Sequence, residues 1–433
     1  MTMNIRTGPV RELGEEILSK RTATAAKDQT LEIRVREILE AVRLGGDKAL
    51  LKLTEEFDKV DISKKGLRVS TSEIESACSK VDIEDIQALE YLQKNISKVE
   101  TWRLKALNST YSDKRIILRQ VTRPLESVGC YIPGGQAAYP STVMMTAVPA
   151  RLAGVNRIVI FSPPSVNGDI EPLVLAAAQL CGVEEVYRVG GAQAMAAAAY
   201  GTETIRPVDK IVGPASRLVT AAKQMVSDTT AVDMPAGPSE ILVLADDSSN
   251  ARSIALDLIS QAEHAPDNVS VLVSTSQRII DKVATQLSEL LEVIPRKEIV
   301  KRALETHGAL LLAESLSQAV EFVNRFGPEH LEILSRRPNE VSKQITSSGI
   351  ILLGNDTPVA ASDYGLGTNH VLPTMGFART YSGLSVLDYV KIIPIVQARR
   401  STLRSMLRPV RTLAKREGLP NHYSALAGRF KND

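Results

Sequence analysis

The residues best suited to acid–base chemistry in this 433-residue chain are two neighbours, Glu329 and His330. They follow Gly327 and Pro328, which predict the end of a helical run and the exposure of what comes next. A carboxyl group and an imidazole can both be tuned towards neutral pH by burial and by neighbouring charges. The pair therefore indicates a general acid/base site. On this pattern alone, the alternative is a solvated loop with two polar side chains.

A second set of residues has the chemistry of metal ligands. Gln261 and His264 are three positions apart near the end of a predicted helix (251–264), so both project from one face. Asp363 and His422 would complete a set of oxygen and nitrogen ligands without thiolates. Such a set suits zinc and leaves room for a substrate. For His264 alone, the alternative is a favourable position at a helix C-terminus.

Two turns that follow predicted strands would let the backbone approach a phosphate or a ring closely. Residues 189–193 read Val-Gly-Gly-Ala-Gln and residues 213–216 read Gly-Pro-Ala-Ser. The first is not GxGxxG, so the standard dinucleotide fingerprint is absent. Tight packing would explain both turns equally well. Cys130 would be a possible thiol nucleophile, but it lacks a His or basic partner nearby in sequence and is interpreted as a buried strand residue.

Composition excludes several classes of function. The net charge of +2 gives no electrostatic footprint for nucleic acid or an anionic membrane. No apolar run approaches the length of a membrane span, and the first 24 residues lack the apolar region of a signal peptide. The three cysteines (78, 130 and 181) form no disulfide framework and suit a reducing compartment. We therefore expect a cytoplasmic protein of two or three domains.

The elements that must position these residues alternate between strands and helices. Helices are predicted in the block before residue 107, and a βαβ rhythm runs from 115 to 226. A second set of strands and helices begins at 239 and continues to 353. The long segment 354–383 has no clear period, which favours a functional loop. From 384 the chain is predicted to be helical and basic.

The fold class expected from this pattern is α/β: two open Rossmann-like domains with a cleft between them, a helical N-terminal segment and a helical C-terminal tail. The predicted boundaries are 1–24 for the N-terminal helical tail, 25–130 with 239–380 for a first α/β domain that carries the metal and acid/base residues, 131–238 for a second α/β domain on the cofactor side, and 381–433 for the C-terminal tail.

Taken together, these stretches resemble the histidinol dehydrogenase family from about Leu31 to the C-terminus. The blocks that carry the resemblance are Tyr131-Ile132-Pro133-Gly134-Gly135, residues 190–194 (Gly-Gly-Ala-Gln-Ala), residues 233–240 (Asp-Met-Pro-Ala-Gly-Pro-Ser-Glu), residues 261–264 (Gln-Ala-Glu-His), residues 328–332 (Pro-Glu-His-Leu-Glu), Asp363-Tyr364 with residues 368–373 (Thr-Asn-His-Val-Leu-Pro), and residues 417–419 (Glu-Gly-Leu) with His422. Separated blocks in one order are far more specific than any one of them.

The resemblance implies a role for each matching residue. One zinc ion per subunit would be held by Gln261, His264, Asp363 and His422, and Glu329 with His330 would be the catalytic acid/base pair. The substrate, L-histidinol, would be bound by Ser239, His370 and Glu417 together with the metal ligands and His330. The NAD cofactor would be contacted by Tyr131, Gln193 and the position of Ser216.

The chain departs from the family pattern in two places. The family usually has Gly-Pro-Gly-Asn where residues 213–216 read Gly-Pro-Ala-Ser, so Ser216 replaces an Asn that contacts the cofactor. This substitution bears on NAD affinity more than on chemistry. Residues 356–362 also differ from the usual Ser-Pro-Glu form.

By the same resemblance, the reaction is the oxidation of L-histidinol to L-histidine through L-histidinaldehyde, with two NAD molecules. His330 would take the hydroxyl proton, and Glu329 would activate a water that attacks the aldehyde. The family forms homodimers in which the C-terminal tail reaches the partner's site.

Two alternatives use the same residues. One is a related zinc- and NAD-dependent dehydrogenase of another hydroxylated compound; the presence of Ser239 and Glu417 favours histidinol. The other is not redox: a zinc hydrolase that uses Glu329, or a metal-binding protein without activity.

Overall fold

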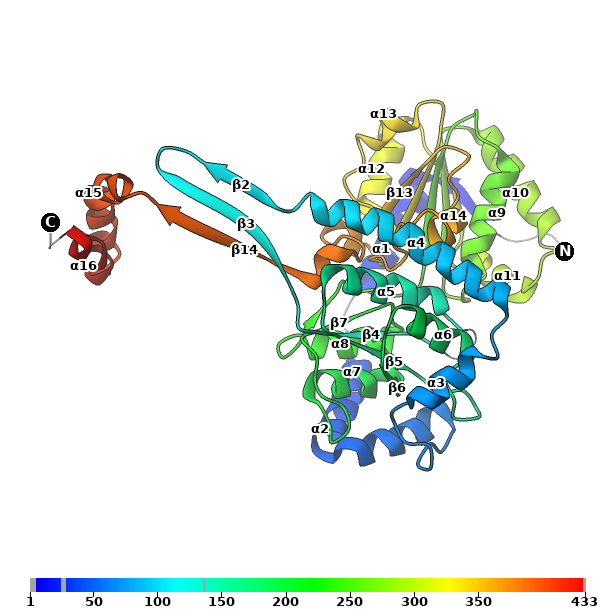
Figure 1. The fold of residues 1–433 in the computed structure, drawn as a ribbon. Helices are drawn as coiled ribbons and strands as arrows, with labels where there is room; N and C mark the ends of the chain where they lie inside the picture. Colours follow the sequence, from blue (N-terminus) through cyan, green and yellow to red (C-terminus); the bar gives the residue numbers. More distant parts are fainter. Residues whose placement is uncertain (1–4, 25–28, 135–137, 431–433) are drawn as a thin grey trace.

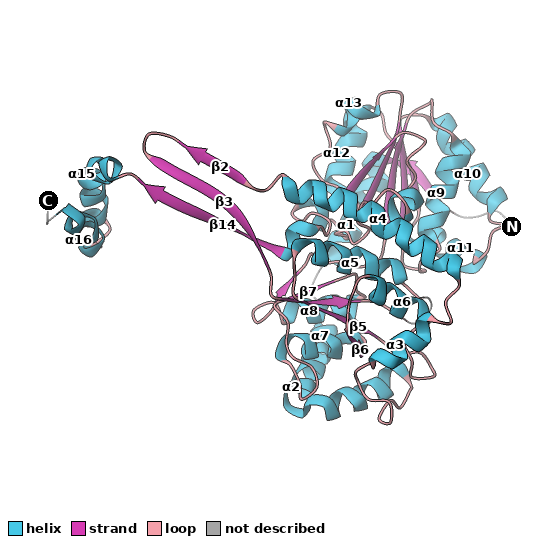
Figure 2. Ribbon diagram, viewed as in Figure 1, coloured by secondary structure: helices cyan, strands magenta, loops and turns pink. Residues whose placement is uncertain are grey.

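The computed structural model describes residues 5–24, 29–134 and 138–430, and it confirms the expected α/β class. Two parallel β-sheets with helices on both faces form the body, and a three-stranded antiparallel sheet projects from it (Figures 1 and 2). Gly135, the last residue of one family block, lies outside the described residues. Among the residues described, no helix is both long enough and apolar enough to span a membrane.

The first parallel sheet has five strands. In spatial order they are β6 (Glu185–Arg188), β5 (Arg157–Ser162), β4 (Ser127–Tyr131), β7 (Lys210–Val212) and β8 (Ala231–Val232). Alternate side chains face opposite cores, because successive residues of a strand point to opposite faces. Ile158 and Ile160 belong to one apolar core, whereas Val159 and Phe161 belong to the other.

Helices cover both faces of this sheet. The first face carries α3 (Thr71–Cys78), α4 (Ile83–Lys105), α5 (Pro140–Ala153) and α6 (Pro172–Leu180), and the second carries α2 (Gln29–Asp58), α7 (Gly191–Tyr200) and α8 (Arg217–Met225). The helix α2 bends at Gly46, whose φ of 53° interrupts helical geometry. A capping box starts α3, in which Ser70 and Glu73 bond each other's backbone N–H.

The helical block before residue 107 therefore packs on the five-stranded sheet. The predicted domain boundaries had grouped it with residues 239–380, which form most of the six-stranded sheet. The apolar side chains of α2 meet α7 and α8, and α3 and α4 pack on α6 and α5. The strand β4 also spans the predicted boundary between residues 130 and 131. Sequence order alone does not reveal which sheet an amphipathic helix covers, and this is the physical reason for the difference.

The second parallel sheet has six strands. In spatial order they are β1 (Arg6–Pro9), β11 (Ala309–Leu312), β10 (Val269–Ser274), β9 (Glu240–Ala245), β12 (His330–Leu334) and β13 (Ile350–Leu353). One face packs on α9 (Ala251–Ala262), α10 (Gln277–Leu290) and α11 (Lys297–His307), and the other packs on a π-helical turn (Val10–Gly14), α1 (Glu15–Thr24) and α12 (Leu316–Phe326). Two short helices, α13 (Pro338–Ser342) and α14 (Val359–Tyr364), follow β12 and β13.

The N-terminal segment was predicted as a helical tail, and the structure differs. Its first described residues form β1, which pairs in parallel with β11 at the edge of the six-stranded sheet. The helix α1 follows and packs beneath that sheet. The segment is thus part of the second domain, because four residues suffice to add an edge strand that sequence periodicity cannot distinguish from a loop.

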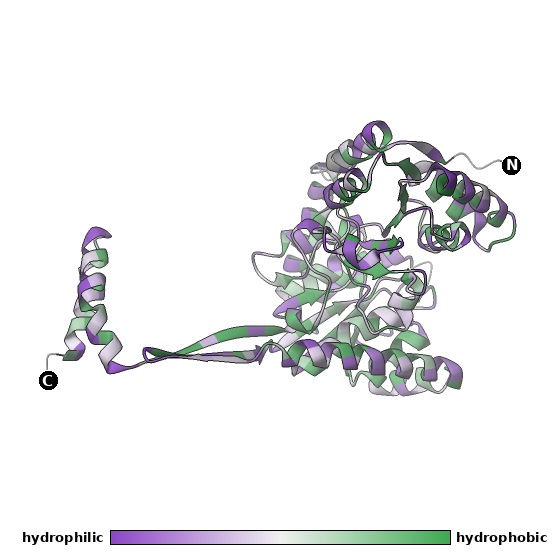
Figure 3. Cartoon of the chain, turned by 90° about the horizontal axis from the view of Figure 1, so that it is seen from above, coloured by the Kyte–Doolittle hydropathy of each residue, from purple (hydrophilic) through white to green (hydrophobic). Residues whose placement is uncertain are grey.

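A long antiparallel arm carries the C-terminal helices away from both domains (Figures 1 and 3). It consists of β2 (Ser109–Ser112), β3 (Ile116–Pro124) and β14 (Val390–Ala398), with α15 (Arg400–Arg416) and α16 (Pro420–Ala427) at its far end. Short 3₁₀ turns occupy Phe377–Arg379, Val386–Tyr389 and Gly428–Phe430. The predicted helical tail is therefore wrong in its first part, where β14 pairs along all nine residues with β3.

Candidate active site

A cleft separates the two parallel sheets and collects most of the candidate residues. Its cavity of about 370 Å³ is bounded by turns at the carboxyl ends of β4 and β7 and by the amino ends of β9 and β12. The candidate residues that line it are Ser216, Ser239, Gln261, His264, Glu329, His330, Asp363 and His370. Most of the separated blocks of sequence thus meet at one place, although Tyr131, Gln193, Glu417 and His422 do not line this cavity.

The pair Glu329 and His330 lies where α12 gives way to β12. Gly327 ends the helix in the left-handed conformation (φ 58°), which favours glycine, and His330 begins the strand. Because β12 runs between β9 and β13, both side chains are enclosed: Glu329 is 5 % exposed and His330 is 2 % exposed. The alternative of a solvated loop is thereby excluded.

A single residue, Glu240, holds both members of the pair through its backbone. Its N–H donates to Oε2 of Glu329 (2.7 Å), and its carbonyl oxygen lies 3.1 Å from Nδ1 of His330. A carbonyl can only accept, so Nδ1 carries the hydrogen and donates it. In the neutral imidazole, Nε2 then presents its lone pair, and it has no hydrogen-bond partner among the described residues. Nε2 is therefore the atom through which His330 can exchange a proton with a molecule in the cleft.

The electrostatics of the pair follow from enclosure. Burial raises the pKa of Glu329 above its usual value and outweighs the opposing effect of His330. For His330, burial lowers the pKa, but the carboxylates of Glu329 and Asp363 outweigh it and hold the pKa well above its usual value. Nδ1 of His330 lies 3.5 Å from Oε2 of Glu329, so the protonation of each group shifts the pKa of the other.

Three of the four predicted metal ligands line the same cleft as the pair. Gln261 is buried near the end of α9, His264 follows just past the helix, and Asp363 comes from α14. Oδ1 of Asp363 is buried and unpartnered among the described residues, as an atom kept for a cation would be. No group of three His, Cys, Asp or Glu residues forms a metal cluster in the part of the chain that the structure describes. Gln261 is outside those types, so an oxygen and nitrogen set still fits zinc if a fourth ligand comes from elsewhere.

The residues predicted to hold substrate are divided between the cleft and the arm. Ser239 immediately precedes β9, and His370 lies with Nε2 3.5 Å from Oγ1 of Thr142. Burial lowers the pKa of His370, which favours its neutral form. Glu417 and His422 are exposed on the C-terminal helices, at the far end of the arm from the cleft (Figure 1).

The predicted cofactor residues lie at the carboxyl edge of the five-stranded sheet, at two depths. Ser216 is exposed on the cleft wall at the start of α8, with no side-chain capping bond. Tyr131 and Gln193 lie below the surface, where the Tyr131 hydroxyl accepts a hydrogen bond from the N–H of Gly191. Both amide atoms of Gln193 are buried without a described partner. Such unsatisfied groups are compatible with contact to a bound molecule.

The interpretation of Cys130 as a buried strand residue is confirmed. It is fully buried in β4, and burial raises the pKa of its thiol to about 12. A thiolate nucleophile is therefore not formed there at neutral pH.

Sequence reasoning did not single out Glu240, although it stands in one of the quoted blocks. A charged residue at the head of the apolar strand Glu240–Ala245 was the available signal. It also missed the buried carboxyl of Glu332 and its half-buried neighbour Asp257, since two acids far apart in sequence give no local pattern.

The fold and cleft define a class: two-domain α/β enzymes with a buried acid/base pair between their sheets. A family model described as histidinol dehydrogenase matches residues 20–430. A histidinol dehydrogenase of Methanothermobacter thermautotrophicus is 45 % identical over 400 residues, covering 92 % of this chain and 93 % of that protein. One of Listeria monocytogenes is 42 % identical over 434 residues, covering 100 % of both. A crystal structure of histidinol dehydrogenase from Elizabethkingia anophelis has a TM-score of 0.93 at 35 % identity and covers 100 % of this chain and 99 % of that one. The chain belongs to the histidinol dehydrogenase family.

Proposed function

We propose that this protein oxidises L-histidinol to L-histidine through L-histidinaldehyde, in histidine biosynthesis, with zinc and NAD. The observation that carries the proposal is the unpartnered Nε2 of His330, which lies 3.7 Å from Oδ1 of Asp363 in the cleft that also holds Gln261 and His264. A base, a candidate cation site and a water-activating carboxyl thus face one cavity.

The residues divide the chemistry between them. His330, held by Glu240 in the tautomer with a free Nε2, takes the hydroxyl proton of the alcohol in the first oxidation. Glu329, whose pKa burial raises, takes a proton from the water that adds to the aldehyde. As the water adds, His330 returns its proton to the aldehyde oxygen, and it then takes a hydroxyl proton of the hydrate in the second oxidation. Burial of both groups excludes bulk water from these steps.

The cofactors supply what side chains cannot. Zinc, held by Gln261, His264, Asp363 and His422, would anchor the imidazole and amine of the substrate and so orient its alcohol. NAD, contacted by Tyr131, Gln193 and Ser216, would accept one hydride in each oxidation. Ser239, His370 and Glu417 would bind the amino alcohol.

The active form is proposed to be a homodimer. Two residues of the proposed site, Glu417 and His422, lie beyond the arm (Figure 1). On β14, Ile392, Ile393, Ile395 and Val396 are 42–61 % exposed, and an apolar strand so exposed calls for a covering surface. A second copy that places its arm across this chain would both cover the strand and complete the site. A cytoplasmic location fits three separated thiols.

An NADH absorbance assay with purified, zinc-loaded protein tests the proposal. We expect two NADH formed for each L-histidinol consumed and L-histidine as the product. A related alcohol without the amine serves as the comparison, because Glu417 would then have no partner. NADH formation from that alcohol and none from L-histidinol would point to another substrate. No NADH from either would contradict a dehydrogenase.

A further inference from the structure

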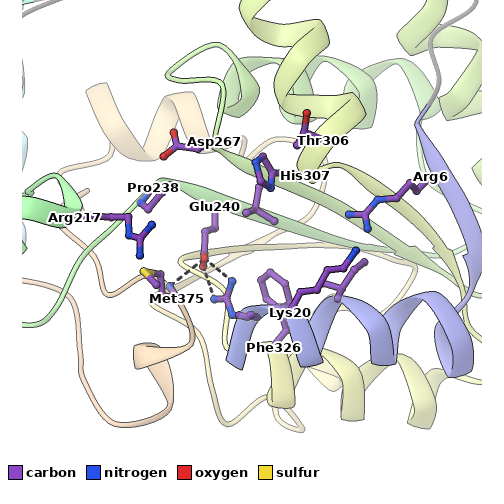
Figure 4. Close-up of a pocket in the computed structure, with 13 residues that line it drawn as sticks. Arg6, Lys20, Arg217, Pro238, Glu240, Asp267, Thr306, His307, Phe326 and Met375 are labelled. Atoms are coloured by element: carbon purple, nitrogen blue, oxygen red, sulfur yellow. Dashed lines mark hydrogen bonds and ion pairs between the residues drawn. The ribbon is translucent and has the colours of Figure 1, made fainter. Parts of the chain in front are cut away.

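The side chain of Glu240 points away from the residues that its backbone holds. It enters a separate cavity of about 680 Å³ between α1 and the six-stranded sheet (Figure 4). There Nη1 and Nη2 of Arg21 donate to its two carboxylate oxygens at 2.5 and 2.7 Å, and the N–H of Met375 donates to Oε1 at 3.0 Å. Glu240 is 2 % exposed and the Arg21 side chain 13 % exposed, so this two-pronged ion pair is largely enclosed.

Arg21 also contacts the element that leads to the acid/base pair. Its guanidinium carbon lies 3.9 Å from the centre of the Phe326 ring. Phe326 is the last residue of α12, and only Gly327 and Pro328 separate it from Glu329. One side chain of α1 therefore touches both structures that fix the pair: the strand that bonds it and the helix end that precedes it.

We propose that Arg21 is a positioning residue for the acid/base pair and acts through Glu240, an inference that rests on the proposed function. A buried ion pair contributes little net stability after desolvation, but a fork of two hydrogen bonds fixes orientation. By fixing the side chain of Glu240, Arg21 fixes the backbone N–H that bonds Glu329 and the carbonyl that bonds Nδ1 of His330. The N-terminal segment thus sets the tautomer and direction of the base without touching substrate.

The neighbouring residue supplies a matched control. Lys20 stands on the same helix and lines the same cavity, but its ammonium bonds Glu16 at 2.5 Å and not Glu240. Arg21→Met removes both prongs of the fork, Arg21→Lys keeps the charge but on a single donor nitrogen, and Lys20→Met removes a charge from the same cavity. Since Arg21→Met leaves a buried carboxylate unpaired, Arg21→Met with Glu240→Gln removes both charges and relieves that penalty.

The test measures kcat, KM for L-histidinol, bound zinc and the urea unfolding midpoint. Arg21→Met should lower kcat about tenfold or more with KM and zinc nearly unchanged, because a small displacement of a catalytic group is enough for such a loss. Arg21→Lys should recover part of kcat. The double variant should recover the unfolding midpoint but not kcat, and Lys20→Met should keep the kcat of the unaltered protein. If kcat followed the unfolding midpoint in every variant, or did not change in Arg21→Met, the positioning role would be refuted.

A spectroscopic measurement keeps this result separate from the proposed function. The Nδ1–H proton of His330, assigned by its loss in His330→Asn, should be observed by NMR in the unaltered protein without substrate. We expect it to shift or broaden in Arg21→Met, to be restored in part in Arg21→Lys, and to remain in Lys20→Met. An unchanged signal in Arg21→Met would contradict the positioning role of Arg21, whether or not L-histidinol is oxidised. If the unaltered protein did not oxidise L-histidinol but the signal still shifted in Arg21→Met, the proposed function would be overturned and the positioning role of Arg21 would remain.

Discussion

Oδ1 of Asp363 lies 3.7 Å from Nε2 of His330, and neither atom has a hydrogen-bond partner among the described residues. Burial raises the pKa of Asp363, but His330 and the other nearby imidazoles outweigh it and hold the pKa below its usual value. A carboxylate that stays ionised in an enclosed cleft beside an amide and imidazoles is suited to a cation. The metal assignment therefore predicts specific losses.

Replacement of His264 by Asn should remove bound zinc and abolish histidinol oxidation. Asn is a smaller side chain with a weaker donor, so one of the four predicted ligands is lost. Metal analysis of the purified variant is the measurement, and chelation of the unaltered protein followed by zinc addition should remove and restore activity. His307→Asn is the control, because His307 lines the cavity beside α1 and not the cleft. Full zinc occupancy and normal activity in His264→Asn would refute the assignment.

Replacement of Glu329 by Gln should slow the second oxidation far more than the first. The amide oxygen can still accept the hydrogen bond from Glu240, so the local structure should persist, but it cannot take a proton from water. A loss of about 10²–10⁴ is typical for removal of a general base. NADH formation is measured separately from L-histidinol and from L-histidinaldehyde. His330→Asn should impair both oxidations, and an equal loss of both in Glu329→Gln would contradict the division of roles.

The buried carboxyl of Glu332 should make stability fall as pH rises. Its Oε1 accepts the N–H of Val359 at 2.9 Å, which ties β12 to the helix that carries Asp363. Burial, with the nearby Asp257 carboxyl second, raises the pKa of Glu332 to about 8, and burial raises that of Asp257 to about 6. A raised pKa means that the folded state binds more protons than the unfolded one. The resulting stabilisation is complete below the unfolded pKa of about 4.5 and is lost as pH rises through about 8.

Urea unfolding midpoints between about pH 5 and pH 9 test this sign. We expect the midpoint of the unaltered protein to fall across that range and the fall to be smaller in Glu332→Gln, where the neutral amide replaces the protonated acid. Glu298→Gln, at an exposed carboxyl on α11, should keep the slope of the unaltered protein. A slope that Glu332→Gln leaves unchanged would place the pH dependence elsewhere.

Local patterns in the sequence were enough for the α/β class and for most helices and strands. Sheet alternation such as Val159 and Phe161 against Ile158 and Ile160 follows from strand geometry and apolar runs. The assignment of α2 to the five-stranded sheet did not follow, because an apolar stripe specifies that a helix is covered and not what covers it. The strand β14 was mistaken for helix because its apolar run, 392–396, has no polar alternation to mark it.

The candidate site, like the fold, was predicted only in part from the sequence. Glu329 and His330 were identified from their types and their Gly-Pro context, and the cleft brings them to Gln261, His264 and Asp363. The role of Glu240 was hidden, since its bonds to the pair come from backbone atoms that every residue has. Contacts made by main chain across a sheet leave no sequence signal.

Mixing two inactive variants should restore part of the activity if the arm completes the partner's site. His264→Asn alters the cleft, and His422→Asn alters α16 beyond the arm. If the arm crosses over, a mixed dimer has one site with both changes and one with neither, so up to half of the sites in that dimer are intact. If the tail returns to its own chain, every site keeps one change and the mixture stays inactive.

The outcome depends on real exchange of subunits. Exchange is established when an affinity tag on one variant also retains the untagged variant during purification. The urea midpoint of each variant, compared with the unaltered protein, shows that both remain folded. A mixture of His307→Asn with His264→Asn gives the activity expected when only one subunit of the dimer is impaired. Once exchange is proven, a mixture of the two inactive variants that stays inactive would rule out a shared site. His422 would then have to reach its own cleft by a movement of the arm.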